Sequence, residues 1–122
     1  MDTSLIHSYP QMIEACMAQL ADVNEQLSDT REALRDAELE AMAAAIEART
    51  EDNKPMYSND KAREIATHRT LKADDGYQRD RSTERILERR KVELEATAER
   101  LRREMRVAMV DYEARMLAHR AA

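Results

Sequence analysis

The residue types that most often do chemistry in proteins are present in this sequence but are not grouped. His7, His68 and His119 lie far apart, and the single cysteine, Cys16, has no second thiol or histidine at zinc-ligand spacing. No acidic loop matches a calcium-binding pattern. Cys16 falls among apolar positions, where a free cysteine usually serves as a small hydrophobic side chain. We therefore expect no metal site and no cofactor.

The acidic residues and the glycine content do not favour catalysis either. Glu47, Glu51 and Asp52 are close enough in sequence to be considered for a cation, but such groups are usually solvated charge. One glycine in 122 residues cannot build a glycine-rich phosphate loop. A nucleophilic triad needs a pocket, which a pair of long helices does not offer. The sequence therefore predicts that the protein is not an enzyme.

Basic side chains are dense in the last third of the chain, and these are the residues that could contact nucleic acid. Arg81, Arg85 and Arg89 belong to the Arg79–Arg90 cluster, where basic side chains are densest and could contact phosphates. Acidic residues are interleaved with them, and four tyrosines are too few for a base-stacking surface. Direct nucleic-acid binding is therefore an alternative that we do not favour.

Charge is unevenly distributed along the chain, whose net charge is −5. Residues 1–50 hold ten acidic and three basic residues, whereas residues 81–122 hold eight acidic and eleven basic residues. An acidic first segment and a basic last segment favour pairing with each other within one chain. The acidic segment also suggests an alternative function, an inhibitor that mimics nucleic acid and blocks a host nuclease or defence complex.

The elements that position these residues are predicted to be helices. The chain is 37% charged, has one glycine and two prolines, and lacks tryptophan and phenylalanine, a composition that suits long helices and disfavours sheets. No apolar run reaches the roughly 18 residues of a membrane span. The start of the chain does not resemble a signal peptide. We therefore expect an all-α, cytoplasmic protein without a membrane segment.

Two segments carry heptad patterns that are typical of coiled coils. In the helix predicted over residues 10–49, the seam positions are Ile13, Cys16, Leu20, Val23, Leu27, Thr30, Leu34, Ala37, Ala41 and Ala44. In the helix predicted over residues 75–119, they are Leu87, Lys91, Leu94, Ala98, Leu101, Met105, Ala108 and Tyr112. Because so narrow an apolar stripe cannot stabilise a lone helix, each segment needs a partner.

Residues 50–58 form the predicted loop between these helices, because Pro55 lacks an N–H and ends the preceding helix. A short helix is expected over residues 59–73. Either Ser58 or Asn59 would be its N-cap.

The start of the last helix is open to two interpretations. Asp74 or Asp75 is a suitable N-cap, and Gly76 weakens a continuous helix. A break between the second and third helices follows from these residues. A helix that continues straight through Gly76 is the alternative.

The first and last helices are expected to form a long antiparallel hairpin, with the short helix between them, so that residues 1–122 make a single coiled-coil domain. Each exposed Glu–Arg pair contributes only ~0.3–0.5 kcal/mol, so charge selects the partner helix more than it stabilises the pair. Two helices bury little surface per residue. We therefore expect a homodimer that forms a helical bundle.

Residues around the loop resemble a pattern found in small coiled-coil proteins of phages and prophages. The matching segments are Lys54-Pro55-Met56-Tyr57-Ser58-Asn59-Asp60-Lys61-Ala62-Arg63 and Leu71-Lys72-Ala73-Asp74-Asp75-Gly76-Tyr77. Such proteins tend to be encoded near recombination or single-strand-annealing functions, and they usually have Pro or Glu where this chain continues after Asp74. The resemblance implies a mobile-element origin and a protein-interaction role, and it supplies no catalytic residues.

The residues singled out for partner binding come from this motif and from the end of the chain. In the motif they are Tyr57, Asn59, Arg63 and Tyr77, although the motif is also explained as a well-capped turn with tyrosines packed across the corner. At the end they are Val107, Val110 and Leu117, which lie partly off the seam. The sequence thus predicts a non-enzymatic adaptor or recombination accessory protein, whose partners are a second copy of itself and another protein.

Overall fold

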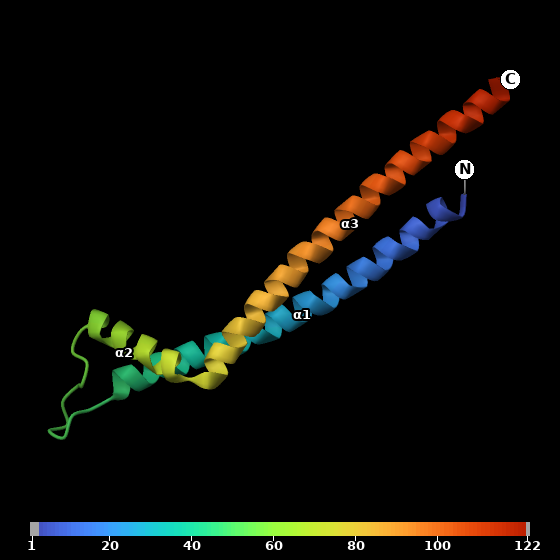
Figure 1. Ribbon diagram of the computed structural model, residues 1–122. Coiled ribbons are helices and arrows are strands. Elements are labelled where there is room, and N and C mark those ends of the chain that lie inside the picture. Colours follow the sequence, from blue (N-terminus) through green and yellow to red (C-terminus); the bar gives the residue numbers. More distant parts are fainter. Residues whose placement is uncertain (1–2, 122) are drawn as a thin grey trace. The chain divides into compact units, whose positions relative to one another are not determined.

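The computed structural model describes residues 3–121, and these residues fold into three α-helices (Figure 1). The helices are α1, Thr3–Glu47, α2, Asp60–Ala73, and α3, Asp75–Ala121. Together they hold 89% of the described residues, among which there is no β-strand. The all-α class predicted from the composition is confirmed.

The helices contribute to two compact units, which we describe separately. Unit 1 comprises Met1–Glu25 and Arg89–Ala122, and unit 2 comprises Gln26–Glu88. Both α1 and α3 have one part in each unit, whereas α2 belongs entirely to unit 2.

Unit 1 is held together by an apolar contact between α1 and α3. Its buried side chains are Tyr9, Cys16 and Val23 from α1 and Leu94, Ala98 and Leu101 from α3. The thiol of Cys16 donates to the carbonyl of Leu94 at 3.2 Å, and Arg90 donates to the side-chain oxygen of Gln19 at 2.9 Å. Residues later in α1 thus meet residues earlier in α3, so the two segments of unit 1 run in opposite directions.

In unit 2 the segments of α1 and α3 also run in opposite directions, since Arg31 contacts Glu88 whereas Glu38, later in α1, contacts Tyr77, earlier in α3. The buried side chains of this unit are Leu27, Leu34, Ala41 and Ala45 from α1 and Leu87 from α3. Arg31 forms ion pairs with Glu84 at 3.3 Å and with Glu88 at 3.0 Å. Because this guanidinium is exposed to solvent, the two pairs align the helices more than they stabilise them.

Burial along α1 and α3 follows the heptad positions with one departure. The remaining seam positions of α3, such as Lys91 and Met105, are half-buried. In α1 the predicted position Ala44 is exposed, and Ala45 is buried instead. A straight helix repeats every 3.6 residues rather than 3.5, so a strict heptad drifts off the contact face over several turns. The prediction of Ala44 as a seam position is therefore wrong, and Ala45 occupies that position.

The first helix begins earlier and ends earlier than predicted. Its start is Thr3 rather than residue 10, and Pro10 lies inside it. Proline is favoured in the first turn of a helix but is also accommodated further along, where it removes one backbone hydrogen bond. Buried Tyr9 ties this early part of α1 to unit 1. The end of α1 at Glu47 leaves its last carbonyls without intrahelical donors, and Arg49 donates to the carbonyl of Ile46. Arg49 also donates to the carbonyl of Ala48, which accepts from the amide of Met56 as well.

A tight loop joins α1 to α2. The amide of Thr50 donates to the carbonyl of Lys54 at 2.8 Å, and Asn53 adopts the left-handed conformation with φ 60°. Asparagine tolerates this conformation better than most residues do. The side chain of Asn59 accepts from the amide of Ala62 at 2.8 Å, so the N-cap of α2 is Asn59 rather than Ser58.

The break between α2 and α3 lies at Asp74. Its backbone is extended (φ −85°, ψ 106°), and its carboxylate accepts from the amide of Tyr77 at 3.0 Å. Asp74 therefore ends one helix and caps the next, and Gly76 lies within the first turn of α3. The helix does not continue straight through this segment, and α3 extends to Ala121 rather than to residue 119.

Candidate protein-interaction groove

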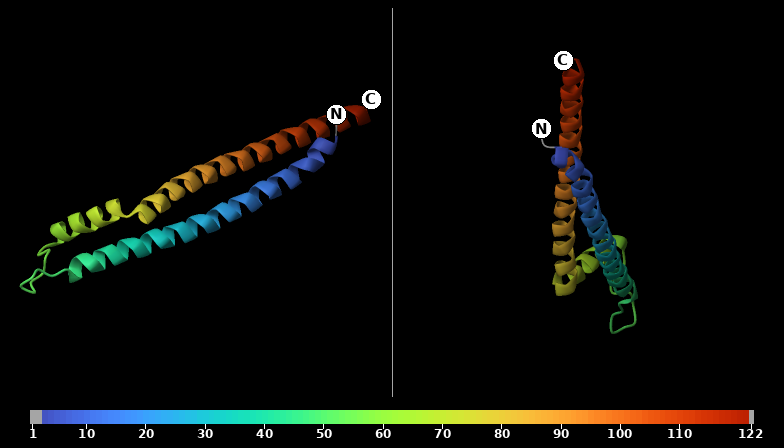
Figure 2. Two further views of the ribbon diagram at one scale, coloured as in Figure 1. Left: turned by 60° about the horizontal axis from the view of Figure 1, so that its bottom comes forward. Right: turned by 90° about the vertical axis from the view of Figure 1, so that its right-hand side faces the viewer.

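A groove lies between α2 and the C-terminal part of α1 in unit 2, where the two helices run alongside each other (Figure 2). Its volume is about 520 Å³, within the range of roughly 300–1,000 Å³ that is common for binding sites. The lining residues are Glu38, Met42 and Ile46 of α1 and Asp60, Arg63, Glu64, Thr67, His68 and Leu71 of α2.

The floor of the groove is apolar and incompletely covered. Met42 and Ile46 are one helical turn apart on α1 and remain 49% and 52% exposed. Leu71 of α2 is half-buried, and no residue of α2 is fully buried. This helix of 14 residues is thus held by few apolar contacts, although isolated helices of about 12–15 residues are marginal in water.

The rim of the groove is acidic. Three carboxylates and one guanidinium line it, which gives a net charge of −2 when His68 is neutral. Arg63 pairs with Asp60 at 3.4 Å, whereas Glu64 has neither an ion pair nor a side-chain hydrogen bond within residues 3–121. The Nε atom of Arg63 is buried without a hydrogen-bond partner in the same part of the chain. The groove therefore has unused polar groups around an apolar floor.

A hydrogen bond fixes the start of α3 against α1 beside this groove. The hydroxyl of Tyr77 donates to the carboxylate of Glu38 at 2.8 Å. Burial, and then this hydrogen bond to a carboxylate, raises the pKa of Tyr77. Glu38 thus lines the groove and also accepts the hydrogen bond from Tyr77, which holds its carboxylate in position.

The four corner residues predicted to bind a partner have different roles in the structure. Asn59 caps α2, Tyr77 bonds to Glu38, and Tyr57 is half-buried in the loop. Of the four, Arg63 alone lines the groove. The motif is thus brought together in unit 2, but two of its residues have structural roles.

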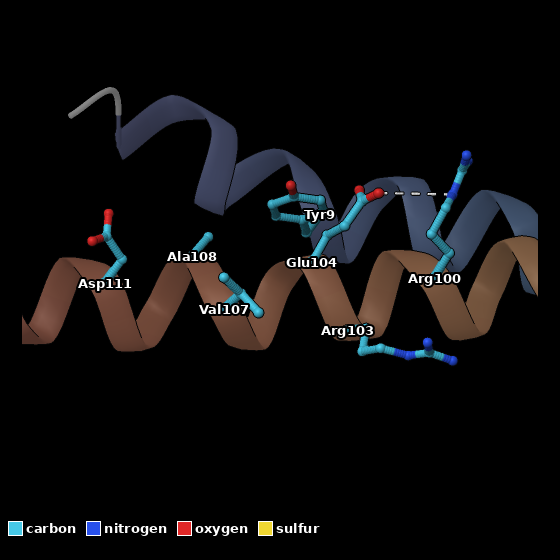
Figure 3. A pocket seen from close by; sticks show the side chains of 7 residues that line it. All are labelled: Tyr9, Arg100, Arg103, Glu104, Val107, Ala108 and Asp111. Carbon is cyan, nitrogen blue, oxygen red and sulfur yellow. Dashed lines mark ion pairs between the residues drawn. The ribbon is translucent and has the colours of Figure 1, made fainter.

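The C-terminal residues singled out from the sequence belong to α3 in unit 1 and do not line the groove. Val107, Val110 and Leu117 are all well exposed. Val107 also lines a shallow hollow beside Tyr9, as Figure 3 shows together with the ion pair between Arg100 and Glu104. This hollow is open to solvent, and its other lining residues are Arg100, Arg103, Glu104, Ala108 and Asp111.

The arginines considered for nucleic-acid binding are not equivalent. Arg81 is half-buried and pairs with Glu84 at 3.0 Å, whereas Arg85 and Arg89 are exposed. Neither Arg85 nor Arg89 has an ion pair within residues 3–121. Contact of these arginines with nucleic acid stays a prediction.

Most of the residues that line the groove were not predicted from the sequence to bind a partner. Met42 and Ile46 were recognisable as apolar residues off the heptad seam, but nothing local showed which helix would lie beside them. Glu64, His68 and Leu71 belong to a short helix with weak amphipathic character. Among the described residues, no three His, Cys, Asp or Glu side chains lie close enough to hold a metal ion. Over the same residues, no helix is both long and apolar enough to cross a membrane.

Comparison with known proteins gives no relative for this chain. No protein-family model matches it, and neither a curated protein nor a solved structure is similar to it.

Proposed function

We propose that this chain is a non-enzymatic interaction protein, in which the groove between α1 and α2 binds a helical segment of another protein. The observation that carries the proposal is the exposed apolar floor, Met42 and Ile46, beside a helix that has no fully buried residue. Covering this floor would remove apolar surface from water and stabilise α2 at the same time. A groove between two helices is a common receptor for an amphipathic helix.

The charge of the rim defines the chemistry of the partner. A segment with apolar side chains one turn apart and flanking Lys or Arg would place its cations against Glu38, Asp60 and Glu64. Because these carboxylates lie on an open rim, their attraction should be screened by salt. We infer a basic amphipathic helix as the occupant.

The proposed architecture is the antiparallel hairpin with a coiled-coil seam. Contacts within each unit support it, since residues later in α1 meet residues earlier in α3 in both. A role in phage nucleic-acid metabolism is part of the proposal through the resemblance of residues 54–63 and 71–77. In that role the protein would act as an adaptor that holds another protein.

A pair of variants tests the groove. In affinity capture from the native host, Met42→Glu/Ile46→Glu should lose a bound protein that wild type retains, because two carboxylates would occupy the apolar floor. Leu39→Glu is the matched control, since Leu39 is an exposed apolar residue of α1 that does not line the groove. The captured protein, once purified, should bind wild type through a basic amphipathic segment, and more weakly at 200 mM than at 50 mM salt.

Two results would contradict this function. One is a captured protein that binds both variants equally, since the groove would then be irrelevant. The other is sub-micromolar DNA binding that weakens steeply with salt and is lost in Arg81→Ala/Arg85→Ala/Arg89→Ala, which would make the protein a nucleic-acid binder. We expect negligible DNA binding by wild type in a low-salt mobility-shift titration.

A further inference from the structure

The part of α3 in unit 1 has a second stripe of residues, on the side of the helix that faces away from α1. Its positions are Val92, Ala96, Glu99, Arg103, Arg106 and Val110, and all six are exposed. They alternate steps of four and three residues, the spacing of coiled-coil seam positions. Each lies two residues, or about 200°, from one residue of the seam in a helix of 3.6 residues per turn. Val92, Glu99 and Arg106 also lie one residue, or about 100°, from another seam residue, so they stand at the edge of the outer side.

The order of residue types along this outer stripe is self-complementary. Val92 and Val110 stand at its two ends and are each 65% exposed. Glu99 and Arg103 stand at its centre and form an ion pair at 3.6 Å within the helix. Figure 3 shows the side chain of Arg103 pointing away from Tyr9, at the edge of the hollow that both residues line. The stripe therefore has apolar ends, and a negative and a positive charge side by side in the middle.

We propose that the outer stripe pairs with the same stripe of a second copy of this chain, in the antiparallel direction, about a two-fold axis at the level of Leu101. In this register Val92 lies opposite Val110, Ala96 opposite Arg106, and Glu99 opposite Arg103 of the second copy. The two-fold axis repeats each pair, as it must in an interface between identical surfaces.

Charge complementarity selects this occupant and this direction. Antiparallel pairing places each Glu99 against an Arg103, whereas parallel pairing would place glutamate against glutamate and arginine against arginine. A shift by one heptad in either direction would set Arg103 opposite Arg106 or Val92, so the valines and the opposite charges would no longer match. Within each Ala96–Arg106 layer, the aliphatic part of the arginine covers the alanine.

This inference is independent of the groove, which lies in unit 2. The sequence predicts a homodimer, and the outer stripe would define the face, the helix direction and the register of its interface. Because only two Val–Val layers supply apolar contact, we expect a reversible dimer that covalent trapping detects more readily than sedimentation.

Disulfide trapping tests the register with single-cysteine changes. Val92→Cys and Val110→Cys should each remain monomeric under mild oxidation, because identical positions would be about 27 Å apart along the helix at 1.5 Å rise per residue. An equimolar mixture of the two variants should form a cross-linked dimer, as should the double variant Val92→Cys/Val110→Cys. Native Cys16 is buried, and the single variants control for any reaction at its thiol.

A charge exchange in the same mixture distinguishes specific pairing from chance collision. Arg103→Glu should lower the cross-linking yield about tenfold, since two attractive contacts become repulsive. Adding Glu99→Arg to the same chains restores opposite charges and should restore the yield. The proposal is overturned if either single-cysteine variant cross-links as well as the mixture does, if the mixture does not cross-link, or if the charge exchange has no effect. Met42→Glu/Ile46→Glu should leave the yield unchanged, so failure of the groove and failure of this interface are separable.

Discussion

At the scale of single residues, polar side chains in this molecule act as caps and cross-links between helices. Asn59 and Asp74 each satisfy a backbone amide at a helix start, and Tyr77 joins α3 to Glu38 of α1. These roles explain much of the motif that the sequence shows around the loop. They also mean that changes at these positions should act mainly on stability.

The hydrogen bond between Tyr77 and Glu38 should be measurable in denaturation. Tyr77→Phe should lower the free energy of unfolding by about 0.5–1.5 kcal/mol at pH 7, because one hydrogen bond to a half-buried side chain is lost. Tyr57→Phe is the control, since the hydroxyl of Tyr57 makes no hydrogen bond within residues 3–121. Equal effects of the two changes in urea melts would contradict the role given to Tyr77.

The same tyrosine gives a prediction for alkaline pH. Its pKa is raised in the folded state, so its contribution is fully present below the ordinary tyrosine pKa of about 10 and is lost as pH rises through the raised value. Wild type should therefore lose more stability between pH 9 and pH 11 than Tyr77→Phe does. Parallel curves for the two proteins in urea melts over this range would show that Tyr77 does not titrate with folding.

The cap of α2 provides the third prediction at this scale. Asn59→Ala should cost about 1 kcal/mol of stability, because the amide of Ala62 loses its acceptor. Ser58→Ala should be nearly neutral, since the side chain of Ser58 does not cap the helix. Hydrogen exchange at the amides of α2 should speed up in the first variant alone. Faster hydrogen exchange in Ser58→Ala would show instead that Ser58 is the N-cap of α2.

At the scale of elements, heptad spacing predicts most of the seam, because burial in paired helices follows periodicity directly. Leu27, Leu34, Leu94 and Leu101 are buried as this spacing requires. The burial of Ala45 in place of Ala44, and the early start of α1, were not predictable in the same way. Both depend on how the helices contact each other over several turns, and local residue preferences do not encode that contact.

The groove was not predictable from sequence for a related reason. Its walls belong to α1 and α2, and their contact depends on the direction that the loop imposes on α2. Arg63 was identified through the motif, but Met42, Ile46 and Glu64 were not. Apolar residues outside the seam were the indication available, and they do not reveal which element lies beside them.

A matched pair of leucines on α1 tests the seam. Leu27 is 2% exposed and Leu39 is 56% exposed. Leu27→Asp should cost several kcal/mol, on the order of 3 or more, because it loses apolar contacts and places a charge in the helix contact. Leu39→Asp should remain within about 1 kcal/mol of wild type, as exposed substitutions usually do. Similar thermal melting of both variants by circular dichroism would refute the assignment of the seam.

At the scale of the whole molecule, the protein is helical, and exposed apolar side chains remain on α1 and α3 after the seam is buried. Two interaction surfaces are proposed, the groove of unit 2 for a basic helix and the outer stripe of unit 1 for a second copy. Composition predicted the all-α class, which the three helices confirm, whereas the interaction role stays a prediction. The two surfaces were not predictable from composition and charge, because they depend on which individual side chains remain exposed.

Site-specific photo-cross-linking from the groove would show whether a partner protein binds there. A benzophenone amino acid would replace Ile46 in one protein and Leu39 in another, since the two positions have similar exposure, 52% and 56%, on the same helix. We expect position 46 to cross-link to one protein, through a segment with apolar residues one turn apart and flanking Lys or Arg, and position 39 not to do so. Equal cross-linking from both positions, or cross-linking of position 46 to nucleic acid, would contradict this expectation.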